Sequence, residues 1–214
     1  MNKLFKTALV IALGSFVLSS CNNKDTFDYE GEYLKQEQTL DSLLSAQKVK
    51  IEAYKNEFMP NAIEDTLTNN FTYLNKKVKR GIWYVVESQP TDNSYSYSLN
   101  ATGTAITYPK LKLKYTARLL DDTIVESDVV GTDYNLGVNS TKITSIWYIS
   151  FFPYSIKFNA NDIILGGLTK DGLKKGSKFK VITPSYYAYG SSSQTTIPAN
   201  SPLVYEFEVL EITN

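Results

Sequence analysis

The sequence predicts an α+β fold, in which an antiparallel sheet follows an N-terminal helical segment. Residues 110–119 and 203–212 alternate apolar with charged side chains, as half-buried antiparallel strands do. The apolar residues of 32–58 recur instead at helical spacing. The 214 residues include 16 tyrosines, and aromatic residues favour sheets. The length suits one domain with an appendage.

Composition excludes several kinds of chemistry. The chain has no histidine, and its single cysteine is Cys21. Catalytic triads with an imidazole base and metal sites with histidine ligands are therefore ruled out. We expect no metal, no cofactor and, at a formal charge of zero, no nucleic-acid partner. The basic cluster at 76–80 is interpreted as a solvated lead-in to a strand.

Residues 1–20 are expected to form a signal peptide. Two lysines precede an apolar run from Ala8 to Leu18, which is too short to span a membrane as a helix. The next residues, Leu-Ser-Ser-Cys, resemble the bacterial lipobox, in which the cysteine is lipidated. An unlipidated signal peptide is the alternative.

A lipid on Cys21 would anchor the chain through a tether over 21–31. We therefore expect a location in the cell envelope at the outer membrane, on either its periplasmic or its surface face. Acidic residues shortly after Cys21 loosely resemble the surface-export signal of Bacteroidota-type lipoproteins.

The segment 32–80 is expected to be helical. Pro60 ends the stronger part of the pattern, and 61–80 continue it weakly. Polar residues inside 32–58 leave open a break into two helices. A thin apolar stripe indicates packing on the chain's own domain or a spacer from the membrane, and it does not favour the alternative of a dimer through 32–58. The stripe consists of Leu40, Leu44, Ile51, Tyr54 and Phe58.

Several strands are predicted after this segment. Residues 81–86 are expected to form a strand, because every residue after Gly81 is β-branched or aromatic. Residues 88–107 are polar and are expected to be a loop or an irregular hairpin. An Asp-Asp turn joins 110–119 to a strand at 124–127. Another strand at 178–182 leads to the C-terminal motif.

That motif, residues 183–212, is the most specific stretch of the chain. It holds Pro-x-x-x-Ala-Tyr-Gly at 184–190, a Ser/Gln/Thr loop, Ile-Pro at 197–198 and a final strand. This order resembles the C-terminal half of the FKBP family of peptidyl-prolyl isomerases, where the same elements enclose a proline-sized pocket. Covering 81–214, the resemblance implies a curved antiparallel sheet of about five or six strands wrapped on one short helix.

The walls of the implied pocket depart from the family pattern. Tyr115 and Thr116 match its Tyr-Thr, but Ala117 replaces a glycine, and the Phe-Asp pair becomes Val125-Glu126. The pocket wall is therefore expected to be thinner, with its carboxylate retained.

The floor departs further. Residues 129–152 exceed the pattern and are interpreted as a loop insert beside the pocket. Asn161–Ile164 resembles the opening of the floor helix, with Asp162 as its cap. The family's floor tryptophan is absent from its expected place, where Gly167 or Leu168 stands. Trp147 of the insert is considered as a substitute.

The resemblance implies a role for each site residue. Tyr189 would donate its hydroxyl to a substrate carbonyl, Ile164 its backbone N–H, and Glu126 would lie at the rim. Tyr189, Glu126 and Tyr115 are the catalytic candidates, and Ile197 would cover the prolyl ring. The expected lining is Tyr115, Val125, Tyr154, Ile163, Ile164, Leu168, Ile197 and Tyr205.

The implied function is a lipid-anchored FKBP-type peptidyl-prolyl isomerase or folding factor that acts on proline-containing polypeptides. The alternative is a non-catalytic FKBP-fold module that binds a peptide or partner protein in a cell-envelope complex. If Leu168 or Trp147 fills the floor, a proline-sized cavity survives. If Tyr154 plugs it, catalysis is not expected.

Overall fold

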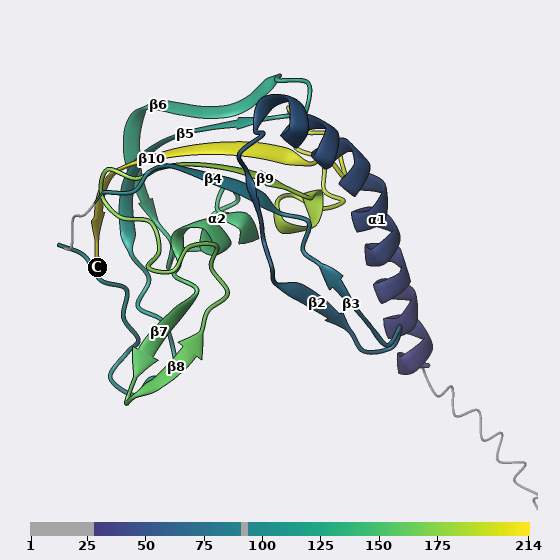
Figure 1. The fold of residues 1–214 in the computed structure, drawn as a ribbon, viewed down its shortest axis with the longest axis horizontal. Coiled ribbons are helices and arrows are strands. Elements are labelled where there is room, and N and C mark those ends of the chain that lie inside the picture. The colour runs from purple at the N-terminus through teal and green to yellow at the C-terminus, as the bar shows by residue number, and fades with distance from the viewer. Residues whose placement is uncertain (1–27, 91–93) are drawn as a thin grey trace, which may run out of the picture.

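A curved antiparallel sheet, a long N-terminal helix and a short inner helix make up the fold (Figure 1). The structure is a computed structural model that describes residues 28–90 and 94–214. The elements follow in the order α1 (Tyr29–Phe58), β1 (Ile63–Glu64), β2 (Thr68–Phe71), β3 (Lys76–Lys79), β4 (Trp83–Ser88), β5 (Lys110–Arg118), β6 (Ile124–Asn135), α2 (Ser145–Phe151), β7 (Ser155–Phe158), β8 (Asn161–Ile164), β9 (Lys178–Thr183), η1 (Ser185–Tyr187) and β10 (Leu203–Thr213). The sheet has the strand order β1-β4-β9-β10-β5-β6, and β2–β3 and β7–β8 form two separate hairpins.

Strand β10 lies at the centre of the sheet, as its alternating sequence predicts. Phe207 pairs with Phe179 of β9 on one side and with Tyr115 of β5 on the other. Tyr205, Phe207 and Val209 are buried on the inner face. Because side chains alternate along a strand, Glu206 projects from the opposite face. The predicted α+β fold with an antiparallel sheet is confirmed.

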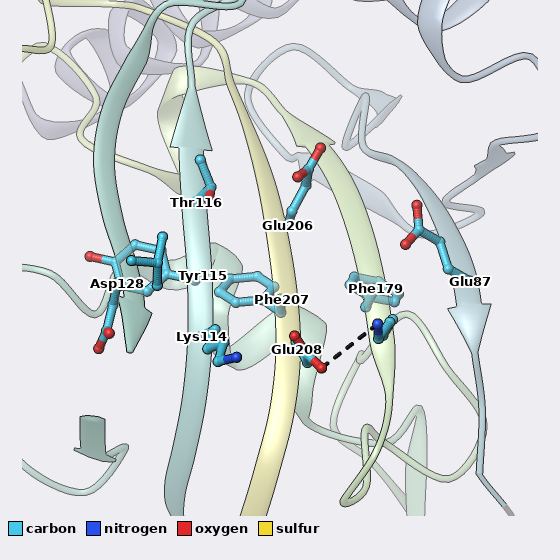
Figure 2. A pocket seen from close by; sticks show the side chains of 11 residues that line it. Glu87, Lys114, Tyr115, Thr116, Asp128, Phe179, Glu206, Phe207 and Glu208 are labelled. Atoms are coloured by element: carbon cyan, nitrogen blue, oxygen red, sulfur yellow. Dashed lines mark ion pairs between the residues drawn. The ribbon is translucent and has the colours of Figure 1, made fainter. Parts of the chain in front are cut away.

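The outer face of the sheet carries charged residues that pair across strands. Figure 2 shows Lys114, Glu206 and Glu208 around a shallow pocket of about 270 Å³. Lys180 lies 2.8 Å from Glu206, and Lys178 lies 3.7 Å from Glu208. Exposed pairs of this kind contribute about 0–1 kcal/mol each. The arrangement is that of a solvated sheet face.

Helix α1 covers one end of this outer face (Figure 1). Asp28 begins the helix by accepting the Gly31 N–H at 2.9 Å, and the helix runs without a break to Phe58. Ile51 and Tyr54 pack against outward-facing residues of β9 and β10. The prediction of a helix over 32–58 is confirmed, and the helix packs on its own domain. None of the helices in the described part of the chain is long and apolar enough to cross a membrane.

The predicted continuation of the helix through 61–80 is wrong. These residues form β1 and the β2–β3 hairpin. Their apolar spacing imitates a helix, but Asn75 takes the left-handed conformation (φ 50°) at the hairpin turn. Asparagine tolerates that conformation better than most residues. The Glu37 carboxylate then accepts the Leu74 N–H at 2.8 Å, which ties the hairpin to α1.

The helix beneath the sheet is formed by a different segment from the one predicted. Residues 161–164 form β8, because Asn159 and Ala160 both have positive φ (47° and 66°), as a two-residue hairpin turn requires. Asp162 pairs with Lys157 at 3.3 Å and caps no helix. The helix on the inner face is α2, which lies within the predicted insert 129–152. The beginning of that insert extends β6, so its assignment as a loop is wrong.

Candidate active site

The Glu126 carboxylate connects three segments of the fold through hydrogen bonds. The Glu126 side chain on β6 accepts a hydrogen bond from the Tyr189 hydroxyl at 2.6 Å and from the Tyr115 hydroxyl at 3.3 Å. Tyr189 follows η1, and Tyr115 lies on β5. The three catalytic candidates proposed from the sequence are therefore brought together.

These hydroxyls stay protonated across the neutral range. Burial and the hydrogen bond to Glu126 raise the pKa of Tyr189 far above its ordinary value. Burial and the Glu126 charge raise the pKa of Tyr115 and of Tyr205 as well. A tyrosine with a raised pKa remains a neutral hydrogen-bond donor. The cluster can donate to a carbonyl oxygen, and it contains no thiol or imidazole.

Aromatic rings pack against the Tyr115 end of this cluster on the inner face of the sheet. Trp147 of α2 is fully buried and contacts Tyr115 and Phe207 edge-on, with ring centroids 5.1 Å apart in each case. Tyr205, also fully buried, stacks on Phe207 at 5.6 Å. Leu168 is 8% exposed and belongs to the same core cluster. Trp147 thus fills the space beneath the inner face of the sheet, and the Leu168 N–H donates to the Ile149 carbonyl of α2 at 3.0 Å.

Two buried hydroxyls, Tyr205 Oη and Thr144 Oγ1, lie near each other at this site. Neither Tyr205 Oη nor Thr144 Oγ1 has a hydrogen bond to the described residues. The Thr144 side chain nevertheless lies close enough to Tyr205 to offset part of the rise in its pKa. Thr144 precedes α2 and was missed in the sequence analysis; its place one turn before Trp147 was the available signal.

Val125 and Ile197 complete the apolar part of the site. Val125 is 8% exposed and Ile197 1%, and both belong to the core cluster that holds Tyr205. The Thr196 hydroxyl donates to the Val125 carbonyl at 2.9 Å, which fixes the loop over β6. Ile197 is therefore held as a cover in this conformation.

The structure does not bring Tyr154, Ile163 and Ile164 to the site. They lie on the β7–β8 hairpin and its approach, which extends below α2 (Figure 1), and they are 41%, 36% and 55% exposed. Their predicted lining role, and the donor role of the Ile164 N–H, depended on a floor helix at 161–164. Since α2 supplies that helix, these assignments are corrected.

The loop that carries Tyr189 and Ile197 is folded on itself. The Gly190 N–H donates to the Ser185 carbonyl and the Asn200 N–H donates to the Gly190 carbonyl, each at 2.8 Å. Gly190 has φ 59°, which glycine adopts without strain. This geometry explains the Tyr-Gly pair of the motif: the turn needs the glycine and aims the preceding tyrosine at Glu126.

Buried tyrosines also predict how stability depends on pH. Burial raises the pKa of Tyr95 and of Tyr187 to about 12. The folded state then holds protons that the unfolded state has lost above pH 10. We expect the free energy of unfolding to be constant up to about pH 9 and to fall between pH 10 and 12. Urea titrations across that range test this, and a flat profile would contradict the burial of these hydroxyls.

Among residues 28–90 and 94–214, no group of three or more acidic, cysteine or histidine side chains could hold a metal ion. The chemistry available to the cluster is therefore that of neutral hydroxyls, one carboxylate and apolar surface.

Comparison with known proteins agrees with this geometry. A sequence model of the family "FKBP-type peptidyl-prolyl cis-trans isomerase" matches residues 104–210, half of the chain. The FKBP-type peptidyl-prolyl cis-trans isomerase FkpA of Buchnera aphidicola subsp. Acyrthosiphon pisum is 42% identical over 65 residues, which are 29% of this chain and 25% of that protein. FkpA of Buchnera aphidicola subsp. Schizaphis graminum is 46% identical over 56 residues, or 25% of this chain and 21% of that protein. The chain thus spans about a quarter or less of these relatives' length.

A solved structure supports the fold. The crystal structure of a peptidyl-prolyl cis-trans isomerase from Pseudomonas syringae pv. tomato matches with a TM-score of 0.50 and 17% identity, covering 81% of this chain and 96% of that one. The matched range 104–210 contains the Tyr115, Glu126, Tyr189 and Tyr205 cluster. This chain belongs to the FKBP-type peptidyl-prolyl cis-trans isomerase family.

Proposed function

We propose that the chain is a peptidyl-prolyl cis-trans isomerase or folding factor, and that proline-containing polypeptides are its substrates. The observation that carries this proposal is the floor: Trp147 packs beneath Tyr115 and Phe207, whereas Tyr154 is exposed and does not plug the site. In this proposal Trp147 of α2 takes the part of the floor tryptophan that is missing near Gly167, and its burial against Tyr115 and Phe207 supports this. Gly167 itself lies against the Phe152 carbonyl, where a Cβ would meet the oxygen at 1.8 Å.

The proposed mechanism is desolvation at an apolar site. Rotation about an X-Pro bond breaks the partial double bond of the amide, against a barrier of about 18–20 kcal/mol. The twisted amide has less charge separation than the planar one, so a dry environment disfavours the ground state more than the transition state. Tyr205, Trp147 and Val125 supply that environment, and no acid, base or metal is needed.

Entry of a prolyl ring requires the site to open. Ile197 is 1% exposed and Tyr205 fully buried, so the loop over 185–200 must lift to admit the ring. A substrate carbonyl would then replace Glu126 as the acceptor of the Tyr189 hydroxyl. Glu126 would remain bonded to Tyr115 at the rim.

The burial of the cover residue Ile197 also favours a second candidate function. A site in which Ile197 and Tyr205 are almost completely buried could hold its loop shut and serve as a non-catalytic binding scaffold for a peptide or partner protein. The two functions differ in one observable: only the first accelerates exchange between cis and trans prolyl bonds.

We further propose that the chain is anchored to the outer membrane by a lipid on Cys21. Cys21 and the predicted signal peptide 1–20 lie outside the described residues, and the support is the lipobox-like Leu-Ser-Ser-Cys sequence. Helix α1 begins at Tyr29, so the last three residues of the predicted tether 21–31 belong to the helix. Mass spectrometry of the membrane fraction tests this. Loss of membrane association in Cys21→Ser supports the anchor, and an unmodified Cys21 in the mature protein contradicts it.

The test of catalysis uses a chromogenic Ala-Xaa-Pro-Phe peptide. We expect the wild-type chain to accelerate its isomerisation and Tyr189→Phe to lower kcat/KM about tenfold, because one hydrogen bond to the reacting amide is lost. Tyr186→Phe is the matched control, since Tyr186 is a neighbouring tyrosine that is 49% exposed. A folded wild-type chain that leaves the uncatalysed rate unchanged would favour the binding scaffold.

A further inference from the structure

A buried glutamine of α1 reaches the loop of the candidate site. Gln47 is 5% exposed, although it lies on a helix whose exposed face is strongly polar. Its Nε2 donates to Ser185 Oγ at 2.8 Å and to the Asn200 carbonyl at 2.9 Å. Its Oε1 accepts the Ser185 N–H at 2.9 Å. Both amide hydrogens and the amide oxygen therefore have partners in the same loop.

The two residues that Gln47 binds lie at opposite ends of that loop. Ser185 begins η1, and Asn200 lies three positions before β10, which begins at Leu203. Tyr189 and Ile197 lie between them. A single side chain from the N-terminal helix thus joins the two ends of the segment that carries both the hydroxyl donor and the apolar cover.

Other contacts hold α1 itself in place. Ile51 and Tyr54 pack against β9 and β10, and the Tyr54 hydroxyl donates to Asp122 at 2.7 Å. Loss of the Gln47 side chain should therefore leave the helix docked on the sheet. Within the loop, it would leave the buried Ser185 N–H without its acceptor and remove the donor to the carbonyl of the exposed Asn200, and a buried N–H of this kind recovers a hydrogen bond by moving toward water.

We propose that Gln47 is a positioning residue, which fixes the loop over 185–200 so that Tyr189 and Ile197 stand correctly over the prolyl site. This inference rests on the proposed isomerase function. Small displacements of a positioned group lower catalytic rates strongly, since catalysis depends on the geometry of the reacting complex. The N-terminal helix then contributes to catalysis although it lies on the opposite face of the sheet from Trp147.

The experiment compares Gln47→Ala with Gln36→Ala in the full-length chain. Gln36 lies on the exposed face of the same helix. We expect Gln47→Ala to lower kcat/KM for the prolyl peptide about tenfold and to speed hydrogen exchange at the Ser185, Gly190 and Asn200 amides. Gln36→Ala should change neither. Both variants are assayed in a buffer where denaturant titration shows them to be fully folded.

A double-mutant cycle separates positioning from general stability. If Gln47 acts through Tyr189, Gln47→Ala combined with Tyr189→Phe should lower kcat/KM by clearly less than the product of the two single effects. Wild-type kcat/KM in folded Gln47→Ala, or fully multiplicative effects in the double variant, would overturn the proposal.

The hydrogen-exchange measurement distinguishes two kinds of failure. If the wild-type chain shows no isomerase activity, the proposed function fails, and faster exchange at 185–200 in Gln47→Ala would still show that Gln47 fixes the loop. If the wild-type chain is active but exchange and kcat/KM are unchanged in Gln47→Ala, the positioning role fails and the proposed function stands.

Discussion

Replacing Trp147 by alanine is expected to lower the free energy of unfolding by about 3–5 kcal/mol, as other truncations of fully buried aromatic residues do. The indole is completely buried and contacts Tyr115, Tyr134 and Phe207. Its removal would leave a large cavity between α2 and the sheet, and the rigid strands could not close it. Urea unfolding followed by tyrosine absorbance measures the change.

The other tryptophan of the chain is the matched control. Trp83 lies on β4 beside α1, where it is partly exposed and Lys55 Nζ stands 4.9 Å from its ring centroid. We expect Trp83→Ala to cost clearly less than Trp147→Ala. Equal losses, or a loss below about 1 kcal/mol for Trp147→Ala, would mean that Trp147 is not the packed floor of the site.

Replacing Asp65 by alanine is expected to destabilise the chain by about 3–5 kcal/mol, because it leaves a buried guanidinium without its counter-charge. The Arg80 and Asp65 side chains form an ion pair and are only 11% and 5% exposed. Arg80 also donates to the Gly166 carbonyl at 2.9 Å, so the pair connects the N-terminal hairpin with the end of β8. Urea unfolding at pH 7 measures the loss.

A surface ion pair of the same hairpin provides the comparison. Lys76 pairs with Asp41 of α1, but these side chains are 43% and 25% exposed. We expect Asp41→Ala to cost at most about 1 kcal/mol. The double variant Asp65→Ala/Arg80→Met should recover part of the loss of Asp65→Ala, since it removes the unpaired charge. Failure of the double variant to recover stability would show that packing, and not charge, sets the effect.

The sequence was informative wherever burial follows a simple period. Alternation along 203–212 predicted the central strand, and the stripe over 32–58 predicted α1. The Tyr-Gly turn of the motif predicted a binding role for Tyr189, because such a turn has few packing reasons to occur. These features depend on neighbouring residues, so they can be read without knowing the fold.

The residues that form the floor of the site could not be predicted from the sequence in the same way. Residues 145–151 are too few for a helical period to stand out, and Asn161–Ile164 imitated a helix start while Asn159 and Ala160 made a hairpin turn. Trp147 reaches the site through contacts with strands distant in sequence. The sequence around Gln47 did not predict its contact with the loop either, because its hydrogen-bond partner Ser185 is 138 positions away.

The most direct test of the prolyl site is where a bound peptide perturbs the chain. In amide NMR spectra of the chain titrated with a proline-containing peptide, we expect the largest shifts at Tyr115, Glu126, Thr144, Tyr189 and Ile197, which surround the floor made by Trp147. Shifts concentrated on the β7–β8 hairpin, at Ile163 and Ile164, would contradict this and place ligand binding outside the cluster.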